Sequence, residues 1–317
     1  MGSRRVQANT VLALDLSDVR KEYAQKMEYL APVRDGSTGE LHPGYWLCDV
    51  TAAEVNGSEI VPLYQKLYSA EAKDFRSEND EVLAAVDLVR RHTQGPGIWV
   101  IDRGGDRKNL LEPLLDRGQR FVIRSTGKRT VIDRRGLLGS VAEVAGRCRL
   151  RHQARIIKIQ DGQEKIYDLR YGAEPIHLPG RPEPLWLVVI VGFGEEALML
   201  LTDLPVVARD SESVWWIVQI YLTRWKIEET FRFVKQSYNL EDIRVMKYQR
   251  LKNLVVLMTA AAYFAATFLG QPMKLRILCE KLLIISQRFF GIPPFRFYAL
   301  ADGIRTILSQ TTPSPPQ

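Results

Sequence analysis

The segment YLTRWKIEETFRFVK, which begins at Tyr221, carries a tyrosine, an arginine, a glutamate and a lysine at helical spacing. The segment contains no proline or glycine and is expected to form one helix of about four turns. At about 100° per residue, Tyr221, Arg224, Glu228 and Lys235 fall within an arc of roughly 60°, and Arg232 lies beside them. This pattern suits a helix that holds a metal ion through Glu228 and binds phosphate groups through the neighbouring side chains.

The same spacing has a plainer explanation. Arg224 and Glu228 are four residues apart and could form a solvated ion pair, which stabilises a helix by roughly 0.3–0.5 kcal/mol. The choice between the two interpretations depends on whether the rest of the chain supplies further acids.

Two further acids end short apolar runs. Asp15 follows Val11–Leu14, and Asp102 follows Ile98–Ile101. A continuous apolar run predicts a strand that is buried on both faces, and an acid at its end points into the cleft on which the strand opens. Taken alone, each acid is more often a turn or cap residue at a strand end.

The spacing Tyr-x2-Arg-x3-Glu-x6-Lys resembles the signature of insertion-sequence-four-type DDE transposases, the YREK signature. Tyr221, Arg224, Glu228 and Lys235 match it at every spacing. Four residue types at three fixed spacings make a fairly specific match.

The order of the acids carries the resemblance over most of the chain, from about residue 11 to residue 270. The order of acids and elements resembles the core of these transposases: Asp15 on a strand, Asp102 on a second strand, then an insertion, then Glu228 on a helix. The fold that this resemblance implies is α/β. It has an RNase H-like mixed sheet flanked by helices, a β-rich insertion and a helical C-terminal region.

The resemblance implies metal-dependent DNA transposition by cut-and-paste phosphoryl transfer. Two Mg²⁺ or Mn²⁺ ions about 3.5–4 Å apart would contact the attacking and leaving oxygens. Asp15 would bridge both ions, and Asp102 and Glu228 would each hold one. A water would free a 3′-hydroxyl at the transposon end, and this hydroxyl would then attack target DNA. The implied DNA-binding residues are Tyr221, Arg224, Arg232 and Lys235. The implied partners are double-stranded DNA, as transposon ends and as target, and a second copy of the chain in a homodimeric synaptic complex.

Several residues compete for a role in this site. Asp18, Asp106 and Glu229 lie close to the three acids in the sequence and are expected to be supporting or solvated residues. Trp186 and Trp225 could stack on a flipped base, but burial in the core is the stronger expectation. A nucleophilic role for the signature tyrosine is the weaker interpretation, because the metal site already supplies activation.

Two departures from the family pattern leave questions open. Leu198 stands where hairpin-forming relatives carry a tryptophan, so the route of second-strand cleavage stays open. Only 14 residues precede Asp15, whereas relatives usually carry an N-terminal module that reads the transposon ends. The alternative function is therefore a truncated, non-catalytic transposase that binds DNA or pairs with full-length copies and inhibits them. A general RNase H-like nuclease is a third hypothesis.

The elements that must position these residues follow from periodicity and turn signals. A helix is expected at Asn79–Thr93, a polar loop at Leu30–Pro43, and Ser211 or Ser213 is expected to cap the signature helix. The remaining strands are expected at Gly44–Val50, Ile60–Leu67, Arg120–Arg124, Arg155–Gln160, Lys165–Arg170, Trp186–Gly192 and Ala197–Leu201. The predicted divisions are a first core part (1–124), an insertion (125–206), a second core part (207–273), a helical region (274–310) and a disordered tail (311–317).

Composition sets broad limits on function. The chain has 317 residues, a formal net charge of +7 and a pI of ≈ 9.3, which mildly favours a polyanionic partner. Its three cysteines and four histidines show no metal-ligand spacing, so a reducing, cytoplasmic environment is expected and a histidine-based metal site is not. The uncharged segment Asn253–Met273 is expected to be a buried core helix and not a membrane span, so no membrane partner is expected.

Overall fold

The computed structural model describes residues 6–36, 38–57, 60–93, 96–160, 163–228 and 240–264. The chain divides into two compact units, one made of residues 1–15 and 78–225 and the other of residues 16–77 and 226–317. Each unit is therefore assembled from segments that are far apart in the sequence. The division into core, insertion and C-terminal region that the sequence favours stays a prediction.

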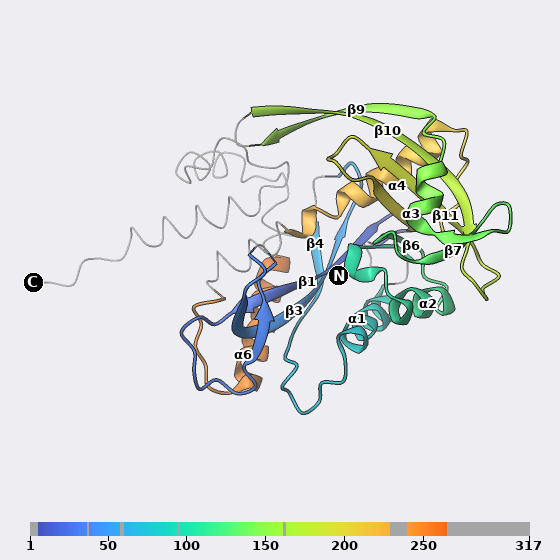
Figure 1. Cartoon of the computed structure of the whole chain (residues 1–317). Helices are drawn as coiled ribbons and strands as arrows, with labels where there is room; N and C mark the ends of the chain where they lie inside the picture. The colour runs from blue at the N-terminus through green and yellow to red at the C-terminus, as the bar shows by residue number, and fades with distance from the viewer. Residues whose placement is uncertain are drawn as a thin grey trace, which may run out of the picture. The chain divides into compact units, whose positions relative to one another are not determined.

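A mixed sheet forms the first unit (Figure 1). Its parallel part consists of β1 (Val11–Arg20), β5 (Ile98–Ile101) and β6 (Phe121–Arg124), neighbours in that order. The sheet continues from β6 through antiparallel pairs to β12 (Leu198–Thr202), β11 (Pro184–Val191), β10 (Gln163–His177), β7 (Thr130–Asp133) and β8 (Leu138–Ser140). All four residues of β5 are buried, as its unbroken apolar run predicts.

Helices flank this sheet. The sequence of α1 (Glu78–His92) has the features that favour a helix. Acidic residues fill its first turn and basic residues its last turn, which suits the helix dipole. Its apolar side chains recur at helical spacing and are buried, at Val82, Ala85, Val86 and Val89. The other helices of the unit are α2 (Lys108–Asp116), α3 (Val141–Arg147) and α4 (Ser211–Thr223).

The strands β9 (His152–Gln160) and β10 form a two-stranded ribbon that extends beyond β11 (Figure 1). Only the second half of β10, from Arg170 to His177, pairs with β11. The first half, from Gln163 to Leu169, pairs with β9 alone among the described residues. Ile157 and Ile166 are opposite each other on this ribbon and are 56% and 54% exposed.

The second unit contains the end of β1, together with β2 (Ala31–Arg34), β3 (Leu41–Ala53) and β4 (Ile60–Tyr68). β3 pairs antiparallel with both β2 and β4. The pairing of β3 with β4 shifts register between Val50 and Thr51, close to Pro62. Proline has no N–H to donate to a sheet, so it is tolerated at such an irregularity.

The helix α6 (Tyr248–Phe264) packs on β4 in the second unit. Leu251, Val255 and Met258 are buried, whereas Val256 and Leu257 on the other side are 60% and 65% exposed. None of the described helices has the length and apolar character needed to cross a membrane. The expected core helix therefore buries one face only, and its predicted continuation to residue 273 lies outside the described residues.

The predicted fold class is confirmed, because the chain is α/β with a large mixed sheet flanked by helices. One local expectation is wrong. The predicted polar loop Leu30–Pro43 contains β2 and the start of β3, which pair with each other despite their few apolar residues. The segment expected to be β-rich also contains the short helix α3, whose capping box joins Ser140 and Glu143.

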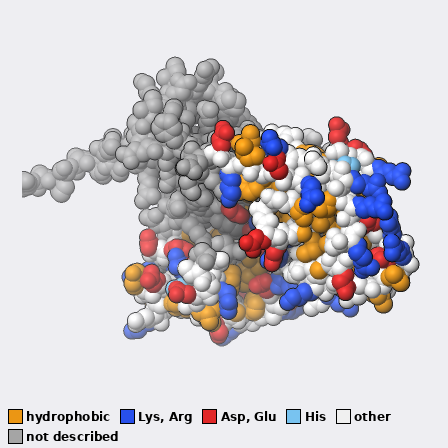
Figure 2. Space-filling view, turned by 45° about the horizontal axis from the view of Figure 1, so that its top comes forward, with side chains coloured by type: hydrophobic (Ala, Val, Ile, Leu, Met, Phe, Trp, Pro, Cys, Tyr) orange, Lys and Arg blue, Asp and Glu red, His pale blue; other side chains and the backbone are white. Residues whose placement is uncertain are grey.

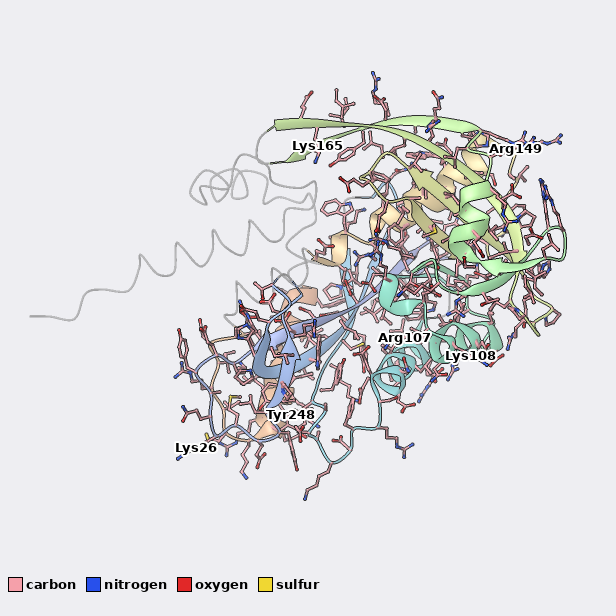
Figure 3. The ribbon with its side chains drawn as sticks, in the orientation of Figure 1. Lys26, Arg107, Lys108, Arg149, Lys165 and Tyr248 are labelled. Carbon is pink, nitrogen blue, oxygen red and sulfur yellow. The ribbon has the colours of Figure 1, made fainter. Side chains whose placement is uncertain are left out.

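Charged side chains are unevenly distributed on the face that Figure 2 shows. Lys and Arg side chains gather along the right edge of this view, whereas acidic and basic groups mix elsewhere on it. That edge is on the side where Figure 3 labels Arg149.

Candidate active site

Asp15 and Asp102 follow paired residues on neighbouring parallel strands of the first unit. Leu14 of β1 is opposite Ile101 of β5, and each acid is the next residue along its strand. Because neighbouring strands are about 4.8 Å apart, the two acids leave the sheet at the same level. Both are half-buried.

The strand that carries Asp15 does not end there, contrary to the prediction. β1 continues to Arg20, and Val19 in this continuation is completely buried. The apolar run that marked the strand stops at Leu14, but the mixed residues that follow still pair as a strand of the second unit. Asp15 is therefore a mid-strand residue, and it belongs to the first unit.

Asp102 ends β5 as predicted and also caps a short 3₁₀ turn, Arg103–Gly105. Its carboxylate accepts a hydrogen bond from the backbone N–H of Gly104 at 2.8 Å. Gly105 is needed for close packing, since a Cβ there would lie 2.7 Å from Cγ2 of Ile101. This capping role holds the carboxylate in one place at the strand end.

Arg107 fixes the turn after Asp102, and sequence reasoning missed it. Its Nε donates to the carbonyl oxygen of Gly104 at 2.6 Å, and its Nη1 donates to Glu78 at 2.7 Å. Figure 3 labels Arg107 at the start of α2. The Gly-Gly pair signals a sharp turn in the sequence, but nothing local indicates that Glu78, 29 residues away, completes it.

Arg224 contacts Asp15 directly. Its Nη1 donates to Oδ2 of Asp15 at 2.7 Å, although the two residues are 209 positions apart. The side chains of Arg224 and Asp15 are 17% and 20% exposed. The guanidinium also lies over the ring of Tyr221, 6.0 Å from its centroid, and Tyr221 is only 8% exposed. One residue of the predicted signature thus contacts the first acid, and a second packs against that residue.

The predicted single helix from Tyr221 onward is interrupted. α4 ends at Thr223, and Arg224 and Trp225 form a turn before helical structure resumes at Lys226. The N–H groups of Arg224 and Trp225 bond to carbonyls three residues back, at 3.0 and 3.4 Å, which tightens the last turn. The common arc of the signature side chains stays a prediction, because Arg232 and Lys235 lie outside the described residues.

The start of α4 also differs from the prediction. Asp210 caps the helix by accepting the N–H of Glu212 at 3.0 Å, whereas Ser211 and Ser213 were expected to do so. Ser211 instead bonds to the hydroxyl of Tyr171 at 2.9 Å. Ser213 accepts the N–H of Val207 at 2.9 Å.

Glu228 belongs to the second unit, and its convergence with the two aspartates stays a prediction. Its side chain is exposed. Glu229, Arg232 and Lys235 lie outside the described residues. In the part of the chain that the structure describes, no three Asp, Glu, His or Cys side chains form a group that could hold a metal ion.

Lys226 anchors the segment that carries Glu228, a role that no sequence pattern indicated. Its ammonium donates to the carbonyl oxygens of Glu54 and Gly57, both at 2.7 Å, within the second unit. Burial lowers the pKa of Lys226 below its usual range. The neighbouring Ile227 is completely buried, so Lys226 and Ile227 point inward while Glu228 points outward.

The acids that compete with the predicted site have mainly structural surroundings where the structure describes them. The side chain of Asp106 is completely buried and accepts hydrogen bonds from Ser125, Thr126 and Arg129. It is therefore a buried supporting residue and not a solvated one. Asp18 is half-buried on β1. Asp203, which was not singled out from the sequence, accepts the N–H of Phe121 at 2.7 Å, and burial raises its pKa.

Both tryptophans that could stack on a base are more exposed than expected for core residues. Trp225 is 39% exposed, at the turn that ends α4. Trp186 is half-buried on β11. Leu198, by contrast, is only 8% exposed and pairs with Ile190 within the sheet.

The donor set of the two aspartates suits a hard divalent cation. Carboxylate oxygens are preferred ligands of Mg²⁺, which also keeps several waters and so needs few protein ligands. Asp15 and Asp102 supply such oxygens from adjacent strands. The guanidinium of Arg224 contributes a positive charge at the same place.

Comparison with known proteins places this geometry in a family. A family model described as a transposase DDE domain matches residues 9–264. No curated protein matches the chain. Among solved structures, the chain is similar to the piggyBac transposase in a cryo-EM structure of its synaptic complex with hairpin DNA, with a TM-score of 0.49 and 10% identity. That match covers 98% of this chain and 55% of the other, so the chain spans about half the length of the piggyBac protein. Because the family model covers most of its length, the chain belongs to the family of transposase DDE domains.

Proposed function

We propose that the chain is a DNA transposase of the insertion-sequence-four type, which cleaves DNA at transposon ends and joins the freed ends to target DNA. The observation that supports this proposal most is the 2.7 Å contact between Arg224 and Asp15. It joins a residue of the YREK signature to an acid on the strand next to Asp102. A solvated ion pair between Arg224 and Glu228 alone would give no reason for this long-range contact.

Asp15 and Asp102 are the proposed ligands of divalent cations. When bound, a pair of Mg²⁺ or Mn²⁺ ions supplies charge neutralisation at the phosphoryl group and activates the attacking oxygen. The chain contributes two carboxylates at one level of a rigid, buried pair of strands. The capping bond from Gly104 and the contacts of Arg107 keep Asp102 from turning away.

Arg224 is the proposed phosphate ligand next to these acids. A guanidinium has a planar fork of N–H donors that suits phosphate oxygens. The guanidinium of Arg224 lies beside the carboxylate of Asp15, so a phosphate group bound to it would lie close to the carboxylates. Tyr221 is buried beneath the guanidinium, which favours a supporting role for its ring over a nucleophilic role for its hydroxyl.

The proposal extends to residues and partners whose roles stay predictions. Glu228 is the proposed third acid, and Arg232 and Lys235 are proposed to bind phosphates further along the signature. The proposed partners are double-stranded DNA and a second copy of the chain. Lys226 supports the proposal for Glu228, because it anchors the local backbone so that this side chain points outward.

The test is a cleavage and strand-transfer assay with the cognate transposon ends and Mn²⁺. Asp15→Asn and Asp102→Asn are each expected to reduce cleavage to the background level, because an amide is a much weaker ligand for a divalent cation than a carboxylate. Both variants should still bind DNA. Asp74→Asn, at an exposed position in the second unit, is the control and should cleave like the wild type.

Full cleavage by either site variant would remove that residue from the active site. A wild-type chain that fails to cleave, yet inhibits an active relative, would support the truncated, non-catalytic transposase instead. Degradation of unrelated DNA or of RNA–DNA hybrids would support a general nuclease.

A further inference from the structure

Three arginines occupy alternate positions where α3 leads into β9. Arg147, Arg149 and Arg151, here called the arginine strip, are all exposed. The residues between and after them, Cys148 and Leu150 among them, are half-buried. Arg147 is the last residue of α3, and the backbone is extended from Cys148 onward, so Arg149 and Arg151 are both presented to solvent.

The backbone of the arginine strip is held in place by close packing. A Cβ at position 172 of β10 would collide with the carbonyl oxygen of Arg149, so only glycine lets the strip lie this close to the sheet. At the end of the strip, Nε2 of His152 lies 3.0 Å from the carbonyl oxygen of Ala208. The His152 ring also packs against Tyr171, with centroids 5.5 Å apart. The exposed arginines therefore extend from a fixed support.

Two charges of the arginine strip, those of Arg149 and Arg151, are not neutralised by a carboxylate, whereas Arg147 lies close to Glu143 and donates to its carbonyl oxygen at 3.1 Å. Within the described parts of the chain, no carboxylate forms an ion pair with Arg149 or Arg151. Nearby Arg155 differs, because its guanidinium binds both oxygens of Asp168 at 2.7 and 3.2 Å. Arg149 and Arg151 thus keep their charges available for an external partner.

The surroundings of the arginine strip add to the positive charge. Arg170 is exposed on β10, opposite Gln153 of β9, and is also without a carboxylate partner among the described residues. Figure 2 shows Lys and Arg side chains gathered along this edge, and Figure 3 shows Arg149 pointing away from the ribbon there. A surface of this kind attracts a polyanion more than it attracts a single small anion.

The spacing of the arginine strip fits a polymer of phosphates. Alternate residues of an extended chain are roughly 6.6 Å apart. One strand of duplex DNA carries a phosphate about every 3.4 Å along its axis, so successive arginines can reach successive or alternate phosphates. Arginine binds phosphate oxygens through its planar donor fork.

We propose that the arginine strip binds the phosphate backbone of duplex DNA without reading its sequence. This inference rests on the proposed function as a DNA transposase, and it adds a surface that holds DNA apart from Asp15 and Asp102. Contacts to phosphates fix the position of a duplex but carry no direct sequence information. The strip would therefore orient transposon or target DNA of any sequence.

The test is the salt dependence of binding to an unrelated 30-base-pair duplex, measured by fluorescence anisotropy without divalent cations. The double variant R149Q/R151Q is expected to lower the slope of log K against log salt by about 1.8, or about 0.9 for each lost phosphate contact. R149K/R151K keeps both charges and should keep most of the slope. The control R90Q/R91Q removes two exposed charges from the last turn of α1 and should bind like the wild type.

Equal slopes for R149Q/R151Q and R90Q/R91Q would overturn the inference, as would a wild-type chain that does not bind the duplex at low salt. A preference for single-stranded over duplex DNA by the wild type would overturn the duplex assignment. The readout is independent of cleavage. If the wild type does not cleave transposon ends but R149Q/R151Q still has a smaller salt slope than the wild type, the strip remains a DNA-binding surface and the proposed function fails. If the wild type cleaves but the two slopes are equal, only the inference about the strip fails.

Discussion

Asp15 and Arg224 show how much of the proposed chemistry depends on single side chains. The guanidinium of Arg224 lies 2.7 Å from the carboxylate of Asp15, and both groups are largely shielded from solvent. A charge-assisted hydrogen bond of this kind contributes about 1.5–3 kcal/mol. Arg224 is therefore in a position to orient Asp15, and the proposed phosphate would bind beside that contact.

Replacing Arg224 tests this role. Arg224→Gln is expected to lower the cleavage rate by about tenfold or more, since about 1.4 kcal/mol corresponds to a factor of ten. Arg224→Lys should recover part of the rate, because it keeps the charge but loses the planar fork. The measurement is the rate of cleavage of cognate ends under single-turnover conditions.

Chemical unfolding of the same variants separates positioning from folding. Both variants should lose at most about 3 kcal/mol of stability, the contribution of one charge-assisted hydrogen bond, and should stay folded in the assay. A rate loss that merely follows a large loss of stability would contradict the proposed role of Arg224.

At the scale of elements, the close approach of the arginine strip to β10 depends on the absence of one side chain. A Cβ at Gly172 would meet the carbonyl of Arg149, whereas a Cβ at Gly146 in α3 would meet nothing within 4 Å. The two glycines thus differ in what an added methyl group does, although both lie near the strip in the same unit.

The matched substitutions Gly172→Ala and Gly146→Ala are expected to act in opposite directions. Gly172→Ala should lower the free energy of unfolding by about 1–3 kcal/mol, the usual range for overpacking. Gly146→Ala should raise it by up to about 1 kcal/mol, because alanine loses less conformational entropy in a helix. Urea unfolding of both variants measures the difference. Equal effects of the two substitutions would show that the strip does not pack on β10 as described.

At the scale of the whole molecule, each compact unit is assembled from separate parts of the sequence, and buried lysines join these parts in the second unit. The ammonium of Lys21 at the end of β1 donates to the carbonyl oxygens of Leu240, Glu241 and Ile243, about 220 residues away. The ammonium of Lys226 likewise donates to two carbonyl oxygens in the turn between β3 and β4. Long-range contacts of this kind close large loops, and their entropic cost rises only slowly with loop length.

The buried ammonium of Lys21 predicts a pH dependence of stability. Burial, partly offset by Glu241 and Asp242, lowers the pKa of Lys21 from 10.5 to about 8. Below pH 8 both the folded and the unfolded chain hold the proton, so the unfavourable burial of the charge is fully present. Between pH 8 and 10.5 the folded chain releases the proton first, so this contribution to the free energy of unfolding rises with pH.

Thermal unfolding of the wild type and of Lys21→Met from pH 7 to pH 10 measures this contribution. The stability of the wild type relative to Lys21→Met should increase above pH 8. Lys26→Met is the control, because Lys26 is exposed, and its difference from the wild type should stay constant. A constant difference for Lys21→Met as well would contradict the assignment of a buried, charged lysine.

The sequence by itself determined the local elements and the family. Apolar runs predicted β5 and the start of β1, helical spacing predicted the buried face of α1, and the ends of both runs predicted Asp15 and Asp102 as site residues. These signals are local, because burial on both faces or on one face imposes a period on neighbouring residues. The YREK spacing indicated the transposase family, which the family model supports over residues 9–264.

Only the tertiary structure decided how distant residues combine. It ends α4 at Thr223, directs Arg224 to Asp15, and buries Lys226 against carbonyls of another hairpin. No local pattern encodes these contacts, because each depends on strand pairing and packing between segments about 170 to 210 residues apart. The sequence therefore predicted which residues could do chemistry, whereas packing within each discontinuous unit determined which of them meet.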